Sequence, residues 1–314
     1  MTATDFEAPR GPRPRAARRT GARYRREALF KVVGLLATLV GLVALAALLF
    51  DLAVHGLPRL SWDFFFNFPS RFAARAGILS AWVGSLLVIL VTATVAVPLG
   101  VAAAIYLEEY ARRNFFTNII EINVSNLAGV PSIIYGLLAL GLFVYTFGTG
   151  RSIFTAGLTL ALLILPIVIV ATREAIRAVP QALREGALAL GATKWQVTRD
   201  HVLPAALPGV LTGVIIGVSR ALGETAPLIT IGALTFIAFL PTPPISTEPP
   251  FISFQWLWDS FTVLPIQAFN WVSRPGVDFH ANAAAAGLVL LVLTLGLNAG
   301  AIYLRYRLRK KLQW

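Results

Sequence analysis

The 314-residue chain contains no cysteine and few charged residues. Without cysteine it has no disulfide bond, no thiolate metal site and no thiol redox chemistry. Charged residues make up 13% of the chain, about half the share of a soluble domain, whereas hydrophobic residues make up 57%. This composition is typical of a multi-pass membrane protein and excludes an ordinary soluble domain.

Several catalytic patterns are also missing from the chain. No G-x-x-x-x-G-K-[ST] loop occurs, so the chain has no site of that kind for ATP. The three histidines, His55, His201 and His280, are scattered without metal-ligand spacing. No nucleophile–base pair stands out within an apolar run, which argues against an integral-membrane enzyme. We therefore expect no catalytic residue, no metal site and no cofactor in this chain.

Long apolar runs dominate the sequence. A helix that crosses roughly 30 Å of hydrocarbon needs about 20 apolar residues, and helices satisfy their own backbone groups there. Six runs are long enough: residues 29–54, 78–107, 119–147, 153–172, 205–240 and 281–303. The sequence therefore predicts an all-α polytopic protein with six transmembrane helices.

The basic residues that give the net charge of +12 are concentrated on one side of the predicted spans. Of 27 Lys and Arg residues, 21 lie in or beside the two tails, with Lys31 and Arg305 included, and in the connections at 108–118 and 173–204. Since cytoplasmic flanks are enriched in Lys and Arg, we predict that both termini are cytoplasmic. Nucleic-acid binding is disfavoured because no aromatic residues are interleaved with the charge. Five basic residues lie on the predicted outer side: Arg59, Arg71, Arg75, Arg151 and Arg274.

The segments outside the spans have distinct compositions. Residues 1–28 are rich in Arg, Pro and Ala and are predicted to be a disordered cytoplasmic tail, and 307–314 form a second basic tail. Residues 55–77 are rich in Phe and are predicted to lie at the outer interface. The transmembrane core is predicted to comprise 78–306.

A long outer loop is predicted at residues 241–280. Its clustered prolines preclude a helix in the first part. The aromatic residues that follow, with Trp256 and Trp258 among them, are predicted to anchor the loop at the membrane surface, although such a loop also offers a docking site for an external partner.

Residues 180–204 form a polar, helix-forming segment between the fourth and fifth apolar runs. Gly191 stands where a helix ends in a left-handed residue. Thr193 and Gln196 have the spacing of a capping box that starts a second helix. We predict a short helix, a turn at Gly191, and a second helix that Pro204 ends.

The order of residues in this segment resembles the EAA loop of ABC importer permeases, which binds the ATPase. Residues 185–204 read E-G-A-L-A-L-G-A-T-K-W-Q-V-T-R-D-H-V-L-P, with Gly186 in place of the first Ala and His201 at a usually apolar position. The alternative is a solvated connector between spans. The resemblance implies that the following residues couple the chain to an ATPase: Glu185, Gly186, Ala187, Gly191, Leu203 and Pro204.

Arg220 and Glu224 are charged residues inside the fifth apolar run, four positions apart. Charges inside a bilayer are costly and persist when they pair or face a wet cavity. One interpretation is a salt bridge that fixes helix packing. The other is an anion path in which the planar donors of Arg220 bind a tetrahedral oxyanion. Residues that would extend such a path are Ser219, Thr225 and Arg173, although topology explains Arg173 equally well.

Two further segments resemble the membrane subunits of bacterial phosphate-specific ABC importers: S-R-A-L-G-E-T-A-P-L (219–228) and A-G-V-P-S-I-I-Y-G-L (128–137). Residues 29–306 together resemble the PstA type. The resemblance implies a MetI-like type I permease fold in the bacterial inner membrane and a role for Arg220 and Glu224 in phosphate passage. It also implies three partners: a PstC-type permease, a PstB-type ATPase dimer that carries ATP and Mg, and a PstS-type phosphate-binding protein.

Two alternatives remain open for the function of the chain. The same fold would serve an importer of sulfate, molybdate or another solute. A proton-coupled secondary carrier would use Glu224 as its proton site and would have no use for the helix pair at 180–204.

Overall fold

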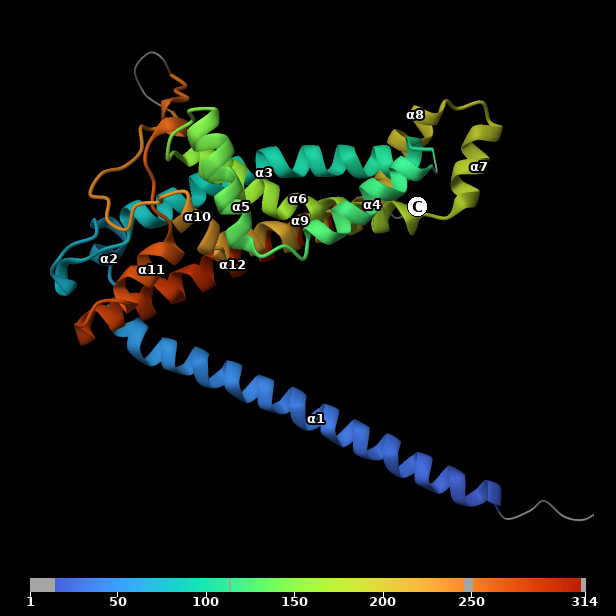
Figure 1. Cartoon of the computed structure of the whole chain (residues 1–314), viewed down its shortest axis with the longest axis horizontal. Coiled ribbons are helices and arrows are strands. Elements are labelled where there is room, and N and C mark those ends of the chain that lie inside the picture. The colour runs from blue at the N-terminus through green and yellow to red at the C-terminus, as the bar shows by residue number, and fades with distance from the viewer. Residues whose placement is uncertain (1–14, 113, 246–250, 312–314) are drawn as a thin grey trace, which may run out of the picture. The chain divides into compact units, whose positions relative to one another are not determined.

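The computed structural model describes residues 15–112, 114–245 and 251–311, which form two units, Met1–Asp51 and Leu52–Trp314. Helices account for most of the described chain (Figure 1). They are α1 (Arg15–Gly56), α2 (Trp62–Phe66), α3 (Leu79–Ile105), α4 (Phe115–Leu127), α5 (Ser132–Ala139), α6 (Ile153–Arg177), α7 (Gln181–Ala189), α8 (Lys194–Gln196), α9 (Leu203–Gly223), α10 (Ala226–Thr230), α11 (Leu264–Val272) and α12 (Val277–Lys311). Shorter 3-10 and π-helical pieces lie at η1 (Leu57–Arg59), η2 (Ala73–Arg75), η3 (Tyr106–Tyr110), η4 (Leu140–Thr146), η5 (Val197–Val202) and η6 (Gln255–Trp258).

Helix α1 contradicts part of the predicted disordered tail. The helix begins at Arg15, so residues 15–28 are helical, while 1–14 lie outside the described residues. Ala, Arg and Glu are strong helix formers, and a helix that the apolar run has nucleated elongates at little cost. The first predicted span therefore continues toward its N-terminal side as one helix.

The second unit is built on four long helices. Helix α3 packs on α6, α6 packs on α9, and α9 packs on α12. The main apolar core lies between these helices and includes Val88, Ile164, Leu222 and Leu228, all buried. The all-α prediction is confirmed.

The third predicted span is broken in the middle. Helices α4 and α5, with η4 as the continuation of α5, are bent by 107° at a short break. Pro131 stands at this break as the N-cap of α5. Proline cannot donate to a helix that continues through it and disfavours a helical residue before it. Within the described residues, five helices are long and apolar enough to cross a membrane, or six crossings if the bent pair counts as one.

The fifth predicted span, 205–240, is not one helix. Helix α9 ends at Gly223, Glu224 has an extended backbone, and α10 follows as a separate short helix. A continuous helix would place Pro227 in its interior, whereas the break places Pro227 in the first turn of α10, where proline is tolerated.

The predicted outer segments gather at one end of the second unit, around α2, α11 and η6 (Figure 1). Phe64 of α2 packs against Trp271 of α11, with ring centroids 5.9 Å apart, and both are buried. Trp256 is also buried, whereas Trp258 is exposed. The prediction of surface anchoring is therefore wrong for Trp256, because the loop folds back and uses this aromatic side chain in the core.

Candidate functional site

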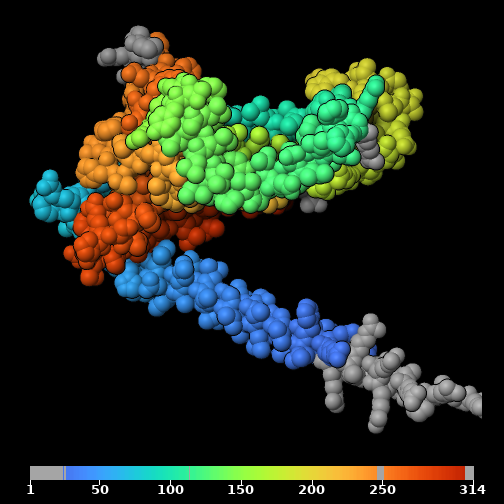
Figure 2. All heavy atoms as spheres, in the orientation of Figure 1, coloured from blue at the N-terminus to red at the C-terminus, as the bar shows by residue number. Residues whose placement is uncertain are grey.

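The segment 180–204 lies at the other end of the second unit, where it forms the surface beside residues 106–127 (Figure 2). Helix α7 follows Pro180 directly, and Gly191 turns the chain with a φ of +87°. Thr193 then caps α8, and the side chains of Thr193 and Gln196 form both bonds of a capping box. The predicted helix, left-handed glycine and capping box are confirmed.

Pro204 does not end the second helix as predicted. The chain continues as a helix from Lys194 through the π-helical η5 into α9, and Pro204 lies in the first turn of α9. In a π-helical stretch the regular i→i−4 hydrogen bonds are already displaced, so a proline directly after it breaks fewer of them. The polar segment is thereby joined to α9 without a flexible linker.

The predicted coupling residues divide into two groups. Glu185, Gly186 and Gly191 are exposed, and Leu190 beside them is 91% exposed. Three others face the protein to differing degrees: Ala187 is buried in a small apolar cluster with Ile176 and Val197, and Leu203 and Pro204 are half-buried. The exposed group forms a protruding surface that is free to receive another protein.

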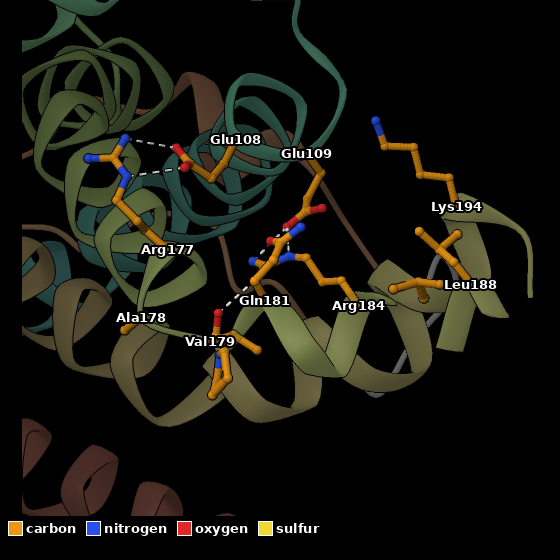
Figure 3. Close-up of a pocket in the computed structure, with 11 residues that line it drawn as sticks. Glu108, Glu109, Arg177, Ala178, Val179, Gln181, Arg184, Leu188 and Lys194 are labelled. Carbon is orange, nitrogen blue, oxygen red and sulfur yellow. Dashed lines mark hydrogen bonds and ion pairs between the residues drawn. The ribbon is translucent and has the colours of Figure 1, made fainter. Parts of the chain in front are cut away.

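Two carboxylates that no sequence motif singled out lie at the base of this segment, and one of them, Glu109, binds the segment itself. Glu109 lies 3.0 Å from Arg184 of α7, and Glu108 lies 3.0 Å from Arg177 at the end of α6 (Figure 3). Both carboxylates belong to η3 at the end of α3. Their signal in the sequence is an adjacent acidic pair at a membrane flank where basic residues are the rule.

Arg220 and Glu224 are brought together at the break between α9 and α10. The Nε atom of Arg220 lies 3.3 Å from the Oε1 atom of Glu224, and the Arg220 side chain is 43% exposed. Thr225, next in the chain, is half-buried and is the N-cap residue of α10. The pair can hold an exposed guanidinium in place within a membrane-spanning region, with donors left over for an anion.

Ser219 and Arg173 do not join this pair. The hydroxyl oxygen of Ser219 lies 2.6 Å from the carbonyl oxygen of Ile215 and beside Oδ1 of Asn298 of α12, so its single proton is donated to one of these two acceptors. Arg173 is buried at the other end of α6, where Glu121 lies 2.7 Å from its guanidinium.

Arg220 of α9 and Arg173 of α6 lie at different levels along these two packed helices. A Cβ on Gly217 of α9 would lie 3.6 Å from Ile164 of α6, and Ile164 precedes Arg173 by roughly nine residues, about 13 Å of helix. Arg220 lies close to the level of Ile164 and therefore belongs to a different site from Arg173.

Comparisons with known proteins identify the family of the chain. The family described as "Binding-protein-dependent transport system inner membrane component" matches residues 96–312. The "Probable ABC transporter permease protein YqgI" of Bacillus subtilis is 31% identical over 89% of this chain and 94% of its own length. The "Phosphate transport system permease protein PstA" of Mycobacterium leprae is 32% identical over 86% of this chain and 81% of its own length.

A solved structure shares the fold at lower identity. A chain of a bacterial alginate ABC transporter, crystallised in complex with an alginate pentasaccharide-bound periplasmic protein, aligns with a TM-score of 0.63 at 15% identity, over 91% of this chain and 96% of the other. The helix arrangement, the protruding segment between α6 and α9, and the relatives over most of the length lead to one conclusion. The chain belongs to the family of binding-protein-dependent transport system inner membrane components and is a membrane-spanning permease subunit of an ABC importer.

Proposed function

We propose that the chain forms part of the translocation path of an ATP-driven importer of inorganic phosphate in the bacterial cytoplasmic membrane. The observation that supports phosphate as the substrate is the likeness to PstA phosphate permeases across most of the chain. The exposed guanidinium of Arg220 supports the same substrate, because a planar fork of donors suits a tetrahedral oxyanion. In this proposal Glu224 holds Arg220 and offsets its charge when the path is empty.

ATP hydrolysis belongs to a separate subunit in this family, and we propose that the segment 180–204 receives the force that it generates. The exposed residues Glu185, Gly186 and Gly191 would enter a groove of the ATPase, where glycine permits a close approach. Closure of the ATPase dimer around ATP and Mg would push the segment and switch the paired permeases between inward-facing and outward-facing states. The proposed partners are a PstC-type permease, a PstB-type ATPase dimer and a PstS-type binding protein.

Other anions remain the second candidate substrates. The fold is shared with a chain of an alginate transporter at 15% identity, so the fold by itself does not select phosphate over sulfate or molybdate.

The test is uptake into vesicles that contain the whole complex and its binding protein. We expect uptake of radiolabelled phosphate with internal or external ATP, according to orientation, and little competition by sulfate or molybdate. Uptake of phosphate driven by a proton gradient without ATPase would contradict the proposal in favour of a secondary carrier. ATP-dependent uptake of sulfate in preference to phosphate would correct the substrate alone.

A further inference from the structure

One guanidinium group ties three helices together at the base of the protruding segment. Arg184 of α7 donates through Nε and Nη2 to Glu109 of η3, at 3.1 and 3.0 Å. It also donates through Nη1 to the carbonyl of Val179 at 2.7 Å and through Nη2 to the carbonyl of Ile176 at 2.8 Å. The carbonyl of Ile176 belongs to the last turn of α6, where the regular i→i−4 donors run out, and Val179 lies two residues beyond the end of that helix. Arg184 thus connects the end of α3, the end of α6 and α7.

Both members of this ion pair are largely withdrawn from solvent. The side chain of Arg184 is 13% exposed and that of Glu109 is 9% exposed. Exposed ion pairs contribute little, whereas removal of one partner from a buried pair leaves an uncompensated charge and is strongly destabilising. Four hydrogen bonds on a planar, rigid group also fix the direction of α7 more firmly than a point charge would.

Neighbouring residues of η3 make weaker contacts with the same region. The Nζ atom of Lys194, at the start of α8, lies 5.1 Å from the centre of the Tyr110 ring. Glu108 binds Arg177, whose side chain is 53% exposed. Consecutive residues of η3 therefore contact α6, α7 and α8.

A cavity of about 760 Å³ lies beside these contacts and is lined by residues of α7, α8, η3 and the α6–α7 connection (Figure 3). Leu188 of α7 faces this space (Figure 3). The protruding segment is thus not packed along its whole length against the unit. Force applied to its exposed tip must reach the long helices through the contacts at its base and through the direct junction with α9.

We propose that Arg184 and Glu109 are positioning residues that form the mechanical joint through which the 180–204 segment moves α3 and α6. This inference rests on the proposed coupling to an ATPase but not on phosphate as the substrate. The joint makes the segment and the ends of α3 and α6 move as one body. Without these contacts the segment would rotate about its connections to α6 and α9, and the motion of the ATPase would not be transmitted to α3 and α6.

The first test measures coupling in the reconstituted complex as substrate imported per ATP hydrolysed. Arg184→Gln is expected to lower this ratio about tenfold, because it leaves the buried Glu109 charge without a cation and because the shorter glutamine, with two donors in place of five, cannot serve Glu109 and both carbonyls together. Arg177→Gln is the matched control, with the same change at an arginine that is 53% exposed, and is expected to stay within about twofold because Glu108 keeps Arg173 as a partner. Equal ratios in wild type and Arg184→Gln would overturn the proposal.

A charge reversal separates the joint from a simple ion pair. In the double variant Glu109→Arg with Arg184→Glu the opposite charges remain, but a carboxylate at 184 cannot donate to the carbonyls of Ile176 and Val179. We expect the coupling ratio to stay low in this variant. Full recovery would show that charge attraction alone matters and would overturn the three-helix joint.

A distance measurement covers the case in which Arg184 variants fail to assemble. Because the chain lacks cysteine, Arg112→Cys beyond η3 and Leu190→Cys at the exposed tip accept a pair of spin labels in otherwise native protein. In the complex with its ATPase, we expect the same distance distribution without nucleotide and with ATP held unhydrolysed. A nucleotide-dependent shift would overturn the joint, whereas absence of any co-purifying ATPase would instead overturn the proposed function.

Discussion

At the scale of single residues, the arginines of this chain differ in how completely their neighbours satisfy them. Arg184 is surrounded by Glu109 and two backbone carbonyls, so it has a structural task. Arg173 is similarly enclosed between Glu108 and Glu121. Arg220 has one carboxylate partner and an exposed side chain, so its guanidinium keeps donors for another group. This contrast supports Arg220 over Arg173 as the residue that meets an anion.

Arg220→Ala is expected to abolish substrate uptake and to leave the complex assembled, since the side chain is not part of the buried core. Arg220→Lys is expected to impair uptake as well, because an ammonium group does not reproduce the fork of donors. Uptake and complex yield are measured side by side. Loss of assembly in Arg220→Ala would instead favour the interpretation of a salt bridge that fixes packing.

Gly191→Val is expected to weaken ATPase binding through the backbone alone. The glycine has a φ of +87°, and a Cβ there would meet no atom within 4 Å, so the substitution introduces strain without collision. A β-branched residue in this conformation costs about 1–3 kcal/mol, whereas asparagine tolerates it better. Pull-down of the ATPase should therefore rank wild type first, then Gly191→Asn, then Gly191→Val.

Gly148→Val supplies the control for this series. Gly148 also has a positive φ, +67°, and no atom within 4 Å of a built Cβ, but it lies before the start of α6, whereas the 180–204 segment follows the end of that helix. If Gly191→Val bound the ATPase as well as Gly148→Val does, the left-handed turn would have no role in presenting the segment.

At the scale of elements, small residues set how closely α9 and α6 approach. Gly209 and Gly213 of α9 face Ala175 and Ala171 of α6, a spacing of small residues that permits close helix packing in membranes. The same packing fixes the level at which α9 ends and Arg220 is presented. The point at which α9 ends therefore determines where Arg220 lies in the proposed path.

Gly213→Ala is expected to destabilise the protein because the new Cβ would collide with the Cβ of Ala171. Overpacking of this kind costs about 1–3 kcal/mol. Gly223→Ala on the same helix is the control, since a Cβ there meets no atom within 4 Å. Thermal unfolding in detergent measures both variants, and equal midpoints would contradict the close approach of α6 and α9.

The sequence predicted elements well where the signal is local and less well where distant contacts decide. Apolar length identified the long helices, and the capping box at Thr193 and Gln196 formed as expected. The prediction that Pro204 ends the second helix of the 180–204 segment was wrong, because the preceding π-helical turn accommodates the proline. Burial of Trp256 depends on packing across the unit, which no local pattern in the sequence reveals.

At the scale of the whole molecule, the two ends of the second unit carry different chemistry (Figure 1). One end gathers the aromatic outer segments, and the other gathers the ion pairs of η3, α6 and α7. Near the end of α12, Arg305 donates to Thr212 in the middle of α9. The distribution of basic residues along the sequence predicted that the two ends of the unit differ. The pairing of Glu109 with Arg184 could not be predicted, because two residues so far apart in sequence give no local pattern that reveals their contact.

The proposed coupling of ATP hydrolysis to transport depends on contact between the 180–204 segment and a nucleotide-hydrolysing partner. In this cysteine-free chain, Leu190→Cys carries a single photo-crosslinker at an exposed residue of the segment, and Val277→Cys, exposed at the opposite end, is the control. In membranes that contain the assembled complex, we predict that the Leu190 probe cross-links to the ATPase and that the Val277 probe does not. A Leu190 probe that labels only lipid or no ATPase, in a complex that still hydrolyses ATP, would contradict the account.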